Sequence, residues 1–307
     1  MDIRTVFMGS PDFSVPILTE LQKIVHVVGV VTQPDRPAGR GRVMQSPPVK
    51  LLADSLLIPT IQPERLSEPW AMQKLAEWSP DLVVVAAFGQ ILKKEVLDMP
   101  LLGCLNVHAS LLPRWRGASP VQAAILHGDL STGVTIMKMD VGLDDGPILT
   151  LREISIREPI TGGALSDNLS MLGAKTLVEI LPSYINGMIA PYPQDHTNAT
   201  YTKKIKKSDG LLDFTLPAQD LVRKVLAYNP WPGAFFSLGD KLIRVHEAHA
   251  HDTFEAEPNA HYIVNDRPAL GTSNGLLVLD LIQPAGRQPM PGIAFLNGHP
   301  DWLKMEN

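Results

Sequence analysis

The sequence predicts an α/β protein in which a doubly wound, mostly parallel sheet is followed by a small, mostly β domain. Through the first two hundred residues, short β-branched runs alternate with stretches of helical spacing, a rhythm typical of βαβ units. The run 81–87 is apolar after its first residue, as expected of a central parallel strand covered on both faces. Beyond residue 208 the pattern changes to short strand-like runs separated by turn residues.

The elements of the first domain follow from the spacing of the apolar residues. Residues 5–8 and 25–31 are β-branched runs, and the stretch between them has helical spacing at 13–23. A helix is predicted at 120–127 because a proline stands in its first turn. The other expected elements are strands at 81–87, 105–108, 133–139 and 148–156, and a long helix at 163–187.

The chain changes character at residue 189. Pro191 and Pro193 are followed by polar residues and then by the basic cluster 203–207, which is typical of a linker. We therefore expect a first domain at 1–188, a linker at 189–207 and a second domain at 208–307. The second domain has the pattern of a small β-barrel, with strands expected at 235–238, 242–246, 261–264, 269–272 and 276–282.

Composition limits the classes of partner. The 307 residues carry a formal net charge of −5, so any polyanion has to meet local basic patches rather than a protein-wide basic field. Hydrophobic residues make up 45% of the chain, which is enough for a sizeable core. Cys104 is the only cysteine, so no intramolecular disulfide is available. Because no apolar stretch approaches the ~20 residues of a membrane span and no apolar leader is visible, we expect a cytoplasmic protein without a membrane partner.

The first strand-to-helix turn disfavours a dinucleotide site. It reads Gly9-Ser10-Pro11, without the Gly-x-Gly-x-x-Gly pattern whose glycines let the backbone approach a pyrophosphate. NAD binding is therefore not expected.

Asn106 and His108 are the first candidates for chemistry. They stand two apart on the strand expected at 105–108, so both side chains point to one face. Near the carboxyl end of a central strand, that face opens onto the crevice in which α/β sheets bind ligands. An amide can stabilise a developing oxyanion, and an imidazole can move a proton near neutral pH. The alternative is that Asn106 ends the strand and His108 is a buried histidine with satisfied hydrogen bonds.

Two polar segments further along the chain allow two interpretations each. Asp144 and Asp145 lie in a loop that Gly142 and Gly146 allow to be tight, and they are either poised acids or solvated turn residues. The Arg-Trp-Arg segment 114–116 is either an exposed basic loop or an anion or aromatic contact at the entrance of a site.

The connection 32–50 is unusually long and basic. From Arg36 to Lys50 it carries four positive charges and no acid. Connections of this kind usually run about 2–6 residues, so a much longer one indicates a function. Its charge predicts a clamp on a phosphate-rich substrate, and the alternative is a solvated basic loop.

The histidines of the segment 246–251 superficially resemble a metal cluster. On a strand, His249 and His251 share a face with Glu247. Zinc needs a supporting set of ligands, and Cys104 lies in the other domain. We therefore expect a surface strand here and no metal.

Two motifs resemble the signature of the folate-dependent formyltransferase superfamily. They are residues 106–117, Asn-Val-His-Ala-Ser-Leu-Leu-Pro-Arg-Trp-Arg-Gly, and residues 139–147, Met-Asp-Val-Gly-Leu-Asp-Asp-Gly-Pro. Three further segments resemble the branch of that superfamily that acts on methionyl-tRNA, namely 33–41, 87–92 and 227–232. The resemblance extends almost from end to end of the chain.

The resemblance implies an enzyme that transfers the formyl group of 10-formyltetrahydrofolate to the α-amine of initiator methionyl-tRNA, for translation initiation. It implies a catalytic trio of Asn106, His108 and Asp144, with Asp145 at a variable position and no metal. The folate is expected to be held, largely through backbone groups, by Phe88, Gln90, Ile91, Leu92, Ser110, Leu111, Leu112, Pro113, Met139, Asp140 and Leu143.

The resemblance also implies how the tRNA is held. Arg40 lies in the loop that relatives insert into the acceptor arm, and a cis Leu112–Pro113 bond, an OB-type barrel from residue 208 and a monomer are expected. Residues 208–307 carry seven Lys and Arg against twelve Asp and Glu, so the basic cluster has to supply much of the positive surface there. The residues expected to contact tRNA are Arg36, Arg40, Arg42, Lys203, Lys204, Lys206 and Lys207.

Two other functions remain open on the sequence. One is a formyltransferase of the same superfamily that acts on a sugar amine or a purine precursor, and the basic connection 32–50 and the β-rich second domain disfavour it. The other is a non-catalytic folate- or RNA-binding module, which the complete set of Asn106, His108 and Asp144 disfavours.

Overall fold

The computed structural model describes residues 1–38, 41, 43–157, 159–252 and 256–304. The contacts of the chain divide it into two compact units. Unit 1 comprises Met1–Pro120, Ser131–Ser155 and Ser166–Lys203, and unit 2 comprises Val121–Leu130, Ile156–Leu165 and Lys204–Asn307. Within the described part of the chain, no helix combines the length and the apolarity that a membrane span requires.

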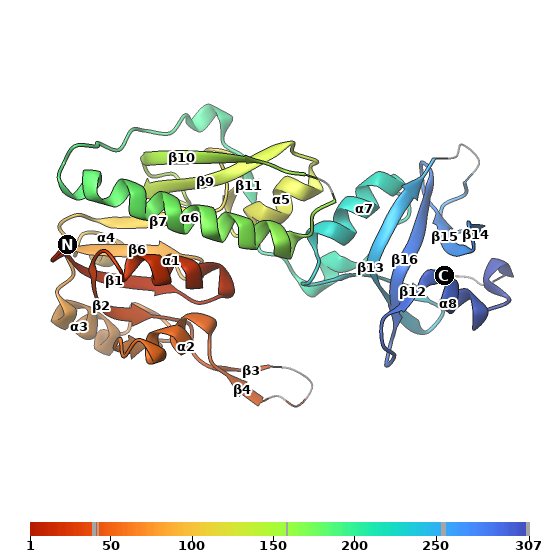
Figure 1. The fold of residues 1–307 in the computed structure, drawn as a ribbon, viewed down its shortest axis with the longest axis horizontal. Coiled ribbons are helices and arrows are strands. Elements are labelled where there is room, and N and C mark those ends of the chain that lie inside the picture. The colour runs from red at the N-terminus through yellow and green to blue at the C-terminus, as the bar shows by residue number, and fades with distance from the viewer. Residues whose placement is uncertain (39–40, 42, 158, 253–255, 305–307) are drawn as a thin grey trace. The chain divides into compact units, whose positions relative to one another are not determined.

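Unit 1 is built on a seven-stranded sheet with the order β10-β9-β7-β6-β1-β2-β5 (Figure 1). The strands from β7 to β5 are parallel to one another. At the other edge, β9 pairs antiparallel with both β7 and β10. This confirms the expected α/β class with a mostly parallel sheet. The strand bounds are β1 Arg4–Gly9, β2 His26–Val31, β5 Thr60–Ile61, β6 Leu82–Ala86, β7 Cys104–His108, β9 Ser131–Lys138 and β10 Ile148–Ser155.

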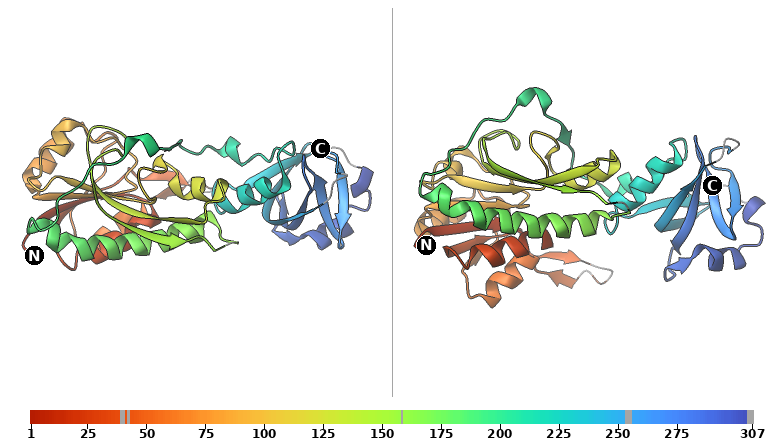
Figure 2. Two further views of the ribbon diagram at one scale, coloured as in Figure 1. Left: turned by 90° about the horizontal axis from the view of Figure 1, so that it is seen from above. Right: turned by 45° about the horizontal axis from the view of Figure 1, so that its top comes forward.

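Helices cover both faces of this sheet, and every residue of β6 is accordingly buried. On one face, Gly173 of the long helix α6 lies against Val107 of β7, and Ile17 of α1 lies beside it. On the other face, Leu75 and Trp78 of α3 join a core with residues of β1 and β6. Figure 2 shows α6 running along the sheet. The helix bounds are α1 Val15–Leu21, α2 Pro48–Ser55, α3 Pro69–Trp78, α4 Lys94–Leu97 and α6 Gly162–Ile185. Helix α5, Pro120–Leu126, belongs to unit 2 from its second residue on.

Gly29 of β2 marks the closest approach of this sheet to α3. A Cβ atom on Gly29 would overlap the indole ring of Trp78. Overpacking a core typically costs ~1–3 kcal/mol. We expect Gly29→Ala to lower the free energy of unfolding by about that amount, as measured by urea denaturation. Gly298→Ala, where the nearest atom would be a carbonyl oxygen at 3.6 Å, is the control. Equal denaturation midpoints for the two variants would contradict the packing described here.

The connection 32–50 is more ordered than the loop that the sequence predicts. It holds a hairpin of β3 Arg36–Ala38 and β4 Val43–Gln45, and α2 already begins at Pro48. Figure 1 shows this hairpin projecting from the sheet of unit 1. Three-residue strands are too short to show a period of two.

The stretch that the sequence predicts as a linker is hydrogen-bonded to unit 1. Tyr192 forms a bridge with Ile148 at the start of β10. Further along, the short strand β11, Tyr201–Thr202, pairs in parallel with β8, Arg116–Gly117. This stretch therefore runs from the start of β10, at Tyr192, to the loop that follows β7, at Tyr201–Thr202.

Unit 2 contains an antiparallel sheet with the order β12-β13-β16-β15-β14, and β17 pairs with β16. Among the described residues, no ladder joins the edge strands β12 and β14. Two helices were not expected from the sequence. They are α7 Ala218–Ala227, which packs Leu221 and Val225 into the core of this unit, and α8 Gly292–Asn297. The strand bounds are β12 Ala234–Leu238, β13 Lys241–His251, β14 His261–Val264, β15 Arg267–Gly271, β16 Leu276–Pro284 and β17 Met290–Pro291.

Candidate active site

The carboxyl end of β7 carries the first two predicted site residues. Asn106 and His108 are buried, with 9% and 6% of their surface exposed. Asn106 is paired with Val85 of the parallel strand β6, and His108 with Thr135 of the antiparallel strand β9. The two side chains lie on one face of the sheet, as the period of two requires, and both reach the same carboxylate.

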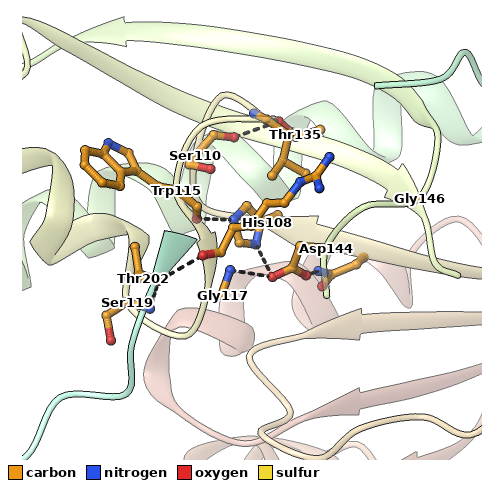
Figure 3. Close-up of polar contacts among 12 residues, drawn as sticks. His108, Ser110, Trp115, Gly117, Ser119, Thr135, Asp144, Gly146 and Thr202 are labelled. Atoms are coloured by element: carbon orange, nitrogen blue, oxygen red, sulfur yellow. Dashed lines mark hydrogen bonds and ion pairs between the residues drawn. The ribbon is translucent and has the colours of Figure 1, made fainter. Parts of the chain in front are cut away.

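That carboxylate belongs to Asp144, in the loop between β9 and β10. Its Oδ1 accepts a hydrogen bond from Nδ2 of Asn106 at 3.3 Å, and its Oδ2 accepts one from the backbone N–H of Gly117 at 2.8 Å. Oδ2 also lies 3.7 Å from Nδ1 of His108 (Figure 3). The structure thus brings an amide and an imidazole from one strand together with a carboxylate that lies 38 residues beyond the amide in the chain.

The hydrogen bonds of His108 define the role of each ring nitrogen. Nε2 lies 3.0 Å from the backbone carbonyl oxygen of Trp115. Because a carbonyl oxygen can only accept, Nε2 carries the hydrogen of this bond. Nδ1 is therefore the ring nitrogen that faces the carboxylate of Asp144.

The loop after β7 holds the Trp115 carbonyl in place. On one side Thr135 anchors the turn, since its Oγ1 donates to the carbonyl of Ser110 at 2.7 Å and accepts from the N–H of Leu112 at 3.0 Å. On the other side the N–H of Trp115 donates to Oγ1 of Thr200 at 2.8 Å. The Leu112–Pro113 bond within the loop is cis, which confirms the expectation.

Gly117 has a conformation that its contact with Asp144 requires. Its φ of +106° lies in the region that favours glycine, and a Cβ there would overlap the carbonyl oxygen of Thr202. Only a glycine can bring its N–H to the Asp144 carboxylate at this point without strain.

The segments expected to bind folate follow β6, β7 and β9. Phe88, Leu92 and Leu112 are buried in the cores of unit 1, so their side chains stabilise the fold. Ile91 and Leu143 are 86% and 56% exposed and leave apolar surface for a ligand. Ser110 and Asp140 make side-chain hydrogen bonds to residues close to them in the chain. Ser110 donates to the carbonyl of Arg114, and Asp140 accepts from the N–H of Val141. The remaining three, Leu111, Pro113 and Met139, are partly exposed.

Gln90 uses its side chain within the protein. Its Oε1 accepts from the N–H of Leu66 at 2.8 Å, and its Nε2 donates to the carbonyl of Pro63 at 3.2 Å. Its backbone therefore remains the part that can meet a ligand, as the resemblance implies. A hollow of about 560 Å³, within the ~300–1,000 Å³ range of small-molecule sites, is lined by Glu64, Arg65, Leu66, Ser67, Met72, Gly89, Gln90, Ile91, Lys93, Glu95 and Val96.

The residues expected to contact tRNA are spread over the hairpin and the basic cluster. Arg36 is exposed at the base of the hairpin and pairs with Glu64 at 3.0 Å. Arg40 and Arg42 lie outside the described residues. The four lysines of the basic cluster are exposed, namely Lys203, Lys204, Lys206 and Lys207. Unit 1 ends at Lys203, and unit 2 resumes at Lys204.

The two arginines of the Arg-Trp-Arg segment 114–116 differ in exposure, so the interpretation as an exposed basic loop fits only one of them. Arg114 is exposed, and its guanidinium lies over the ring of Trp115 at 4.4 Å. Arg116 is only 2% exposed, so an exposed loop is the wrong description for it. It donates to Gln194 and Tyr201, which approach from the stretch expected to be a linker. Gln194 carries no motif, and no sequence signal singles it out.

The residues offered as alternatives to this chemistry have other roles. Burial raises the pKa of the Cys104 thiol to about 12, so it is not a thiolate nucleophile. His246 hydrogen-bonds with Gln283, and His249 with Asp280. Within the described ranges, no group of three or more His, Cys, Asp or Glu side chains is placed to hold a metal ion.

Comparison with known proteins covers most of the chain. Residues 3–181 match the family described as formyl transferase, and residues 204–300 match the formyl transferase C-terminal domain. A relative from Myxococcus xanthus, called methionyl-tRNA formyltransferase, is 45% identical over 296 residues, which are 96% of this chain and 95% of that protein.

Solved structures share the fold at lower identity. HypX from Aquifex aeolicus in complex with tetrahydrofolic acid has a TM-score of 0.65 and 18% identity over 96% of this chain, which spans about half (47%) of the HypX chain. An N-formyltransferase from Helicobacter canadensis, in complex with folinic acid and dTDP-3-aminofucose, has a TM-score of 0.66 and 17% identity over 94% of this chain and 100% of that chain. At these identities the likeness concerns the fold alone.

Proposed function

The chain belongs to the formyl transferase family, and from that premise we propose that it transfers the formyl group of 10-formyltetrahydrofolate to the α-amine of initiator methionyl-tRNA. The observation that carries this proposal is the convergence of Asn106 and His108 on the carboxylate of Asp144. The relative at 45% identity over almost the whole chain supports methionyl-tRNA as the acceptor.

The proposed reaction is a direct transfer. The neutral α-amine attacks the formyl carbon on N10 of the folate, and a C–N bond forms as the carbonyl π electrons move onto oxygen. The tetrahedral intermediate carries an oxyanion and a protonated amine. The amine then loses a proton, N10 gains one, and the bond between the carbon and N10 breaks. The products are formylmethionyl-tRNA and tetrahydrofolate.

The three side chains divide this work. Nδ2 of Asn106 has two hydrogens, of which one is directed to Asp144 and the other is free to bind the oxyanion. Protonated Nδ1 of His108 assists at the same oxygen. Asp144 holds both partners in place and relays protons, through water, from the amine towards N10. Burial of Asn106 and His108 strengthens these electrostatic interactions, because the surroundings have a low dielectric constant.

The formyl donor is proposed to lie along the segments 88–92 and 139–143. The exposed apolar side chains of Ile91 and Leu143 support this position. The occupied side-chain amide of Gln90 supports recognition through backbone groups. A solved structure of the same fold contains tetrahydrofolic acid, which supports a folate as the donor.

The tRNA is proposed to meet the hairpin with Arg36, Arg40 and Arg42 and the basic cluster 203–207. Unit 2 is proposed to be an OB-type barrel that helps to hold it, with domain limits at 1–188, 189–207 and 208–307. The family matches at 3–181 and 204–300 support these limits. We further propose that the enzyme is a cytoplasmic monomer.

The cluster lysines give a prediction about salt dependence. Each lysine that contacts a phosphate releases counterions, so its loss lowers the slope of log affinity against log salt by about 1. We expect Lys206→Gln together with Lys207→Gln to weaken charged-tRNA binding and to lower that slope by about 2, as measured by filter binding from low to high salt. Lys175→Gln, at a side chain 74% exposed on α6, is the control. An unchanged slope would show that these lysines do not contact tRNA phosphates.

The decisive experiment is the transfer of labelled formyl from 10-formyltetrahydrofolate to charged initiator tRNA. We expect label on methionyl-tRNA and none on the uncharged tRNA, which offers no α-amine. Nucleotide-linked amino sugars and purine-precursor amines serve as alternative acceptors in parallel. Transfer to one of these without transfer to tRNA would overturn the proposed acceptor, and folate binding without turnover on any of them would overturn the proposed activity.

A further inference from the structure

We propose that Gln194 is a positioning residue that holds the Asp144 loop in its working conformation, and that Arg116 fixes the orientation of its amide. This inference rests on the proposed function, in which Asp144 aligns His108 and relays protons. Gln194 lies between α6 and β11, 50 residues beyond Asp144, and is only 6% exposed. Its Nε2 donates to the backbone carbonyl of Asp144 at 2.9 Å and to that of Gly146 at 2.7 Å.

The orientation of this amide is determined by its partners. Oε1 accepts from Nε of Arg116 at 3.1 Å and from Nη2 at 2.7 Å. A guanidinium can only donate and a carbonyl can only accept, so a reversed amide would face a donor with its NH₂ and two carbonyls with its oxygen. Both ends of Gln194 are therefore saturated in one orientation alone.

Arg116 is in turn held by the chain around Gln194. Nη1 donates to the hydroxyl of Tyr201 at 3.3 Å, and Nη2 lies 3.1 Å from Nδ1 of His196. None of these described partners is a carboxylate, and none of the ion pairs among the described residues involves Arg116. A buried guanidinium with four fixed donor contacts gives Gln194 a rigid support.

The loop that Gln194 holds has an unusual backbone conformation at Asp144. Asp144 has a φ of +48°, a left-handed conformation that non-glycine residues adopt less readily than glycine. Such a conformation persists only where its surroundings hold it. The backbone carbonyl of Asp144 is held by Gln194, and its carboxylate by Gly117 and Asn106. Without Gln194 the backbone of Asp144 loses this hydrogen bond, and the residue is held through its carboxylate alone.

Gln194→Glu tests this role with almost no change in shape. The introduced carboxylate keeps the acceptor for Arg116 and adds an ion pair, but it has no donor for the carbonyls of Asp144 and Gly146. A misplacement of about 1 Å costs up to about 10²-fold in rate. We expect a folded protein with a thermal midpoint within a few degrees of the wild type, a kcat lowered by about 10- to 100-fold, and a KM for charged tRNA changed by less than about threefold.

A double-mutant comparison separates positioning from a structural effect. If Gln194 acts through Asp144, Gln194→Glu lowers kcat in the wild-type background but hardly lowers it further in Asp144→Asn. Gln22→Glu is the matched control, because its Nε2 donates to the carbonyl of Thr19 at the far end of α1. Equal losses in both backgrounds, or wild-type kcat in the single variant, would overturn the inference.

Hydrogen exchange of the peptides that cover 139–147 tests the same inference without any activity. We expect faster exchange in Gln194→Glu than in the wild type and in Gln22→Glu, confined to this loop and the adjoining 110–118 segment. Unchanged exchange there would overturn the inference whatever the enzyme acts on. A wild-type protein that forms no formylmethionyl-tRNA would instead overturn the proposed function, and the exchange result would still decide the role of Gln194.

Discussion

Replacement of His108 by alanine is expected to lower the single-turnover rate of formyl transfer by about 10²–10⁴-fold at neutral pH. The imidazole is buried, and the bond from Nε2 to the Trp115 carbonyl fixes Nδ1 as the nitrogen that faces Asp144. Removal of the ring leaves the oxyanion with Asn106 alone and leaves the Asp144 carboxylate with no cationic partner among its described contacts. Rapid-quench measurement with saturating folate and enzyme in excess over charged tRNA reports the chemical step.

Two controls separate catalysis from folding in this experiment. His26→Ala removes an exposed imidazole at the start of β2, at the opposite end of the parallel strands, and is expected to retain the wild-type rate. The circular dichroism and the folate affinity of His108→Ala should remain close to those of the wild type. A folded His108→Ala protein with near-normal single-turnover rates would eliminate this histidine as the proton-handling group.

Where the relevant pattern is local, the sequence predicts the site well. Asn106 and His108 share a face because they are two residues apart on a strand, and the hydrophobic run of β6 identifies the neighbouring central strand. The pair of glycines around Asp144 predicts a tight loop. That this loop reaches Asn106 is a tertiary fact, and the choice between a poised acid and a solvated turn needs the coordinates.

The supporting contacts are the part that periodicity does not predict. Gln194 and Thr200 lie in a stretch whose prolines and polar residues predict a linker, yet their side chains hold the loops on both sides of the site. Arg116 looks like a surface residue from its neighbours and is buried because Gln194 and Tyr201 enclose it. Such contacts join residues 50 to 85 positions apart, and one sequence contains no signal for them.

Asp144→Asn is expected to lower the single-turnover rate by about 10²–10⁴-fold with little loss of stability. The side-chain oxygen of the introduced amide can still accept from the Gly117 N–H, and its NH₂ can donate to Asn106 once the Asn106 amide turns over. The hydrogen bonds are therefore retained, while the negative charge beside His108 and the base that relays the proton are both lost.

Asp145→Asn is the matched control for this charge removal. Asp145 directs its carboxylate towards Gly142 rather than towards the trio, and its Oδ1 is buried without a hydrogen-bond partner among the described atoms. Loss of its charge should therefore leave the single-turnover rate within about threefold of the wild type. A tenfold change in rate corresponds to ~1.4 kcal/mol in the activation free energy, so this limit is a small effect. Parallel single-turnover assays and thermal melts of the two variants measure the contrast. Equal rate losses in the two would show that the net charge of the loop, and not the contact of Asp144 with His108, sustains the transfer.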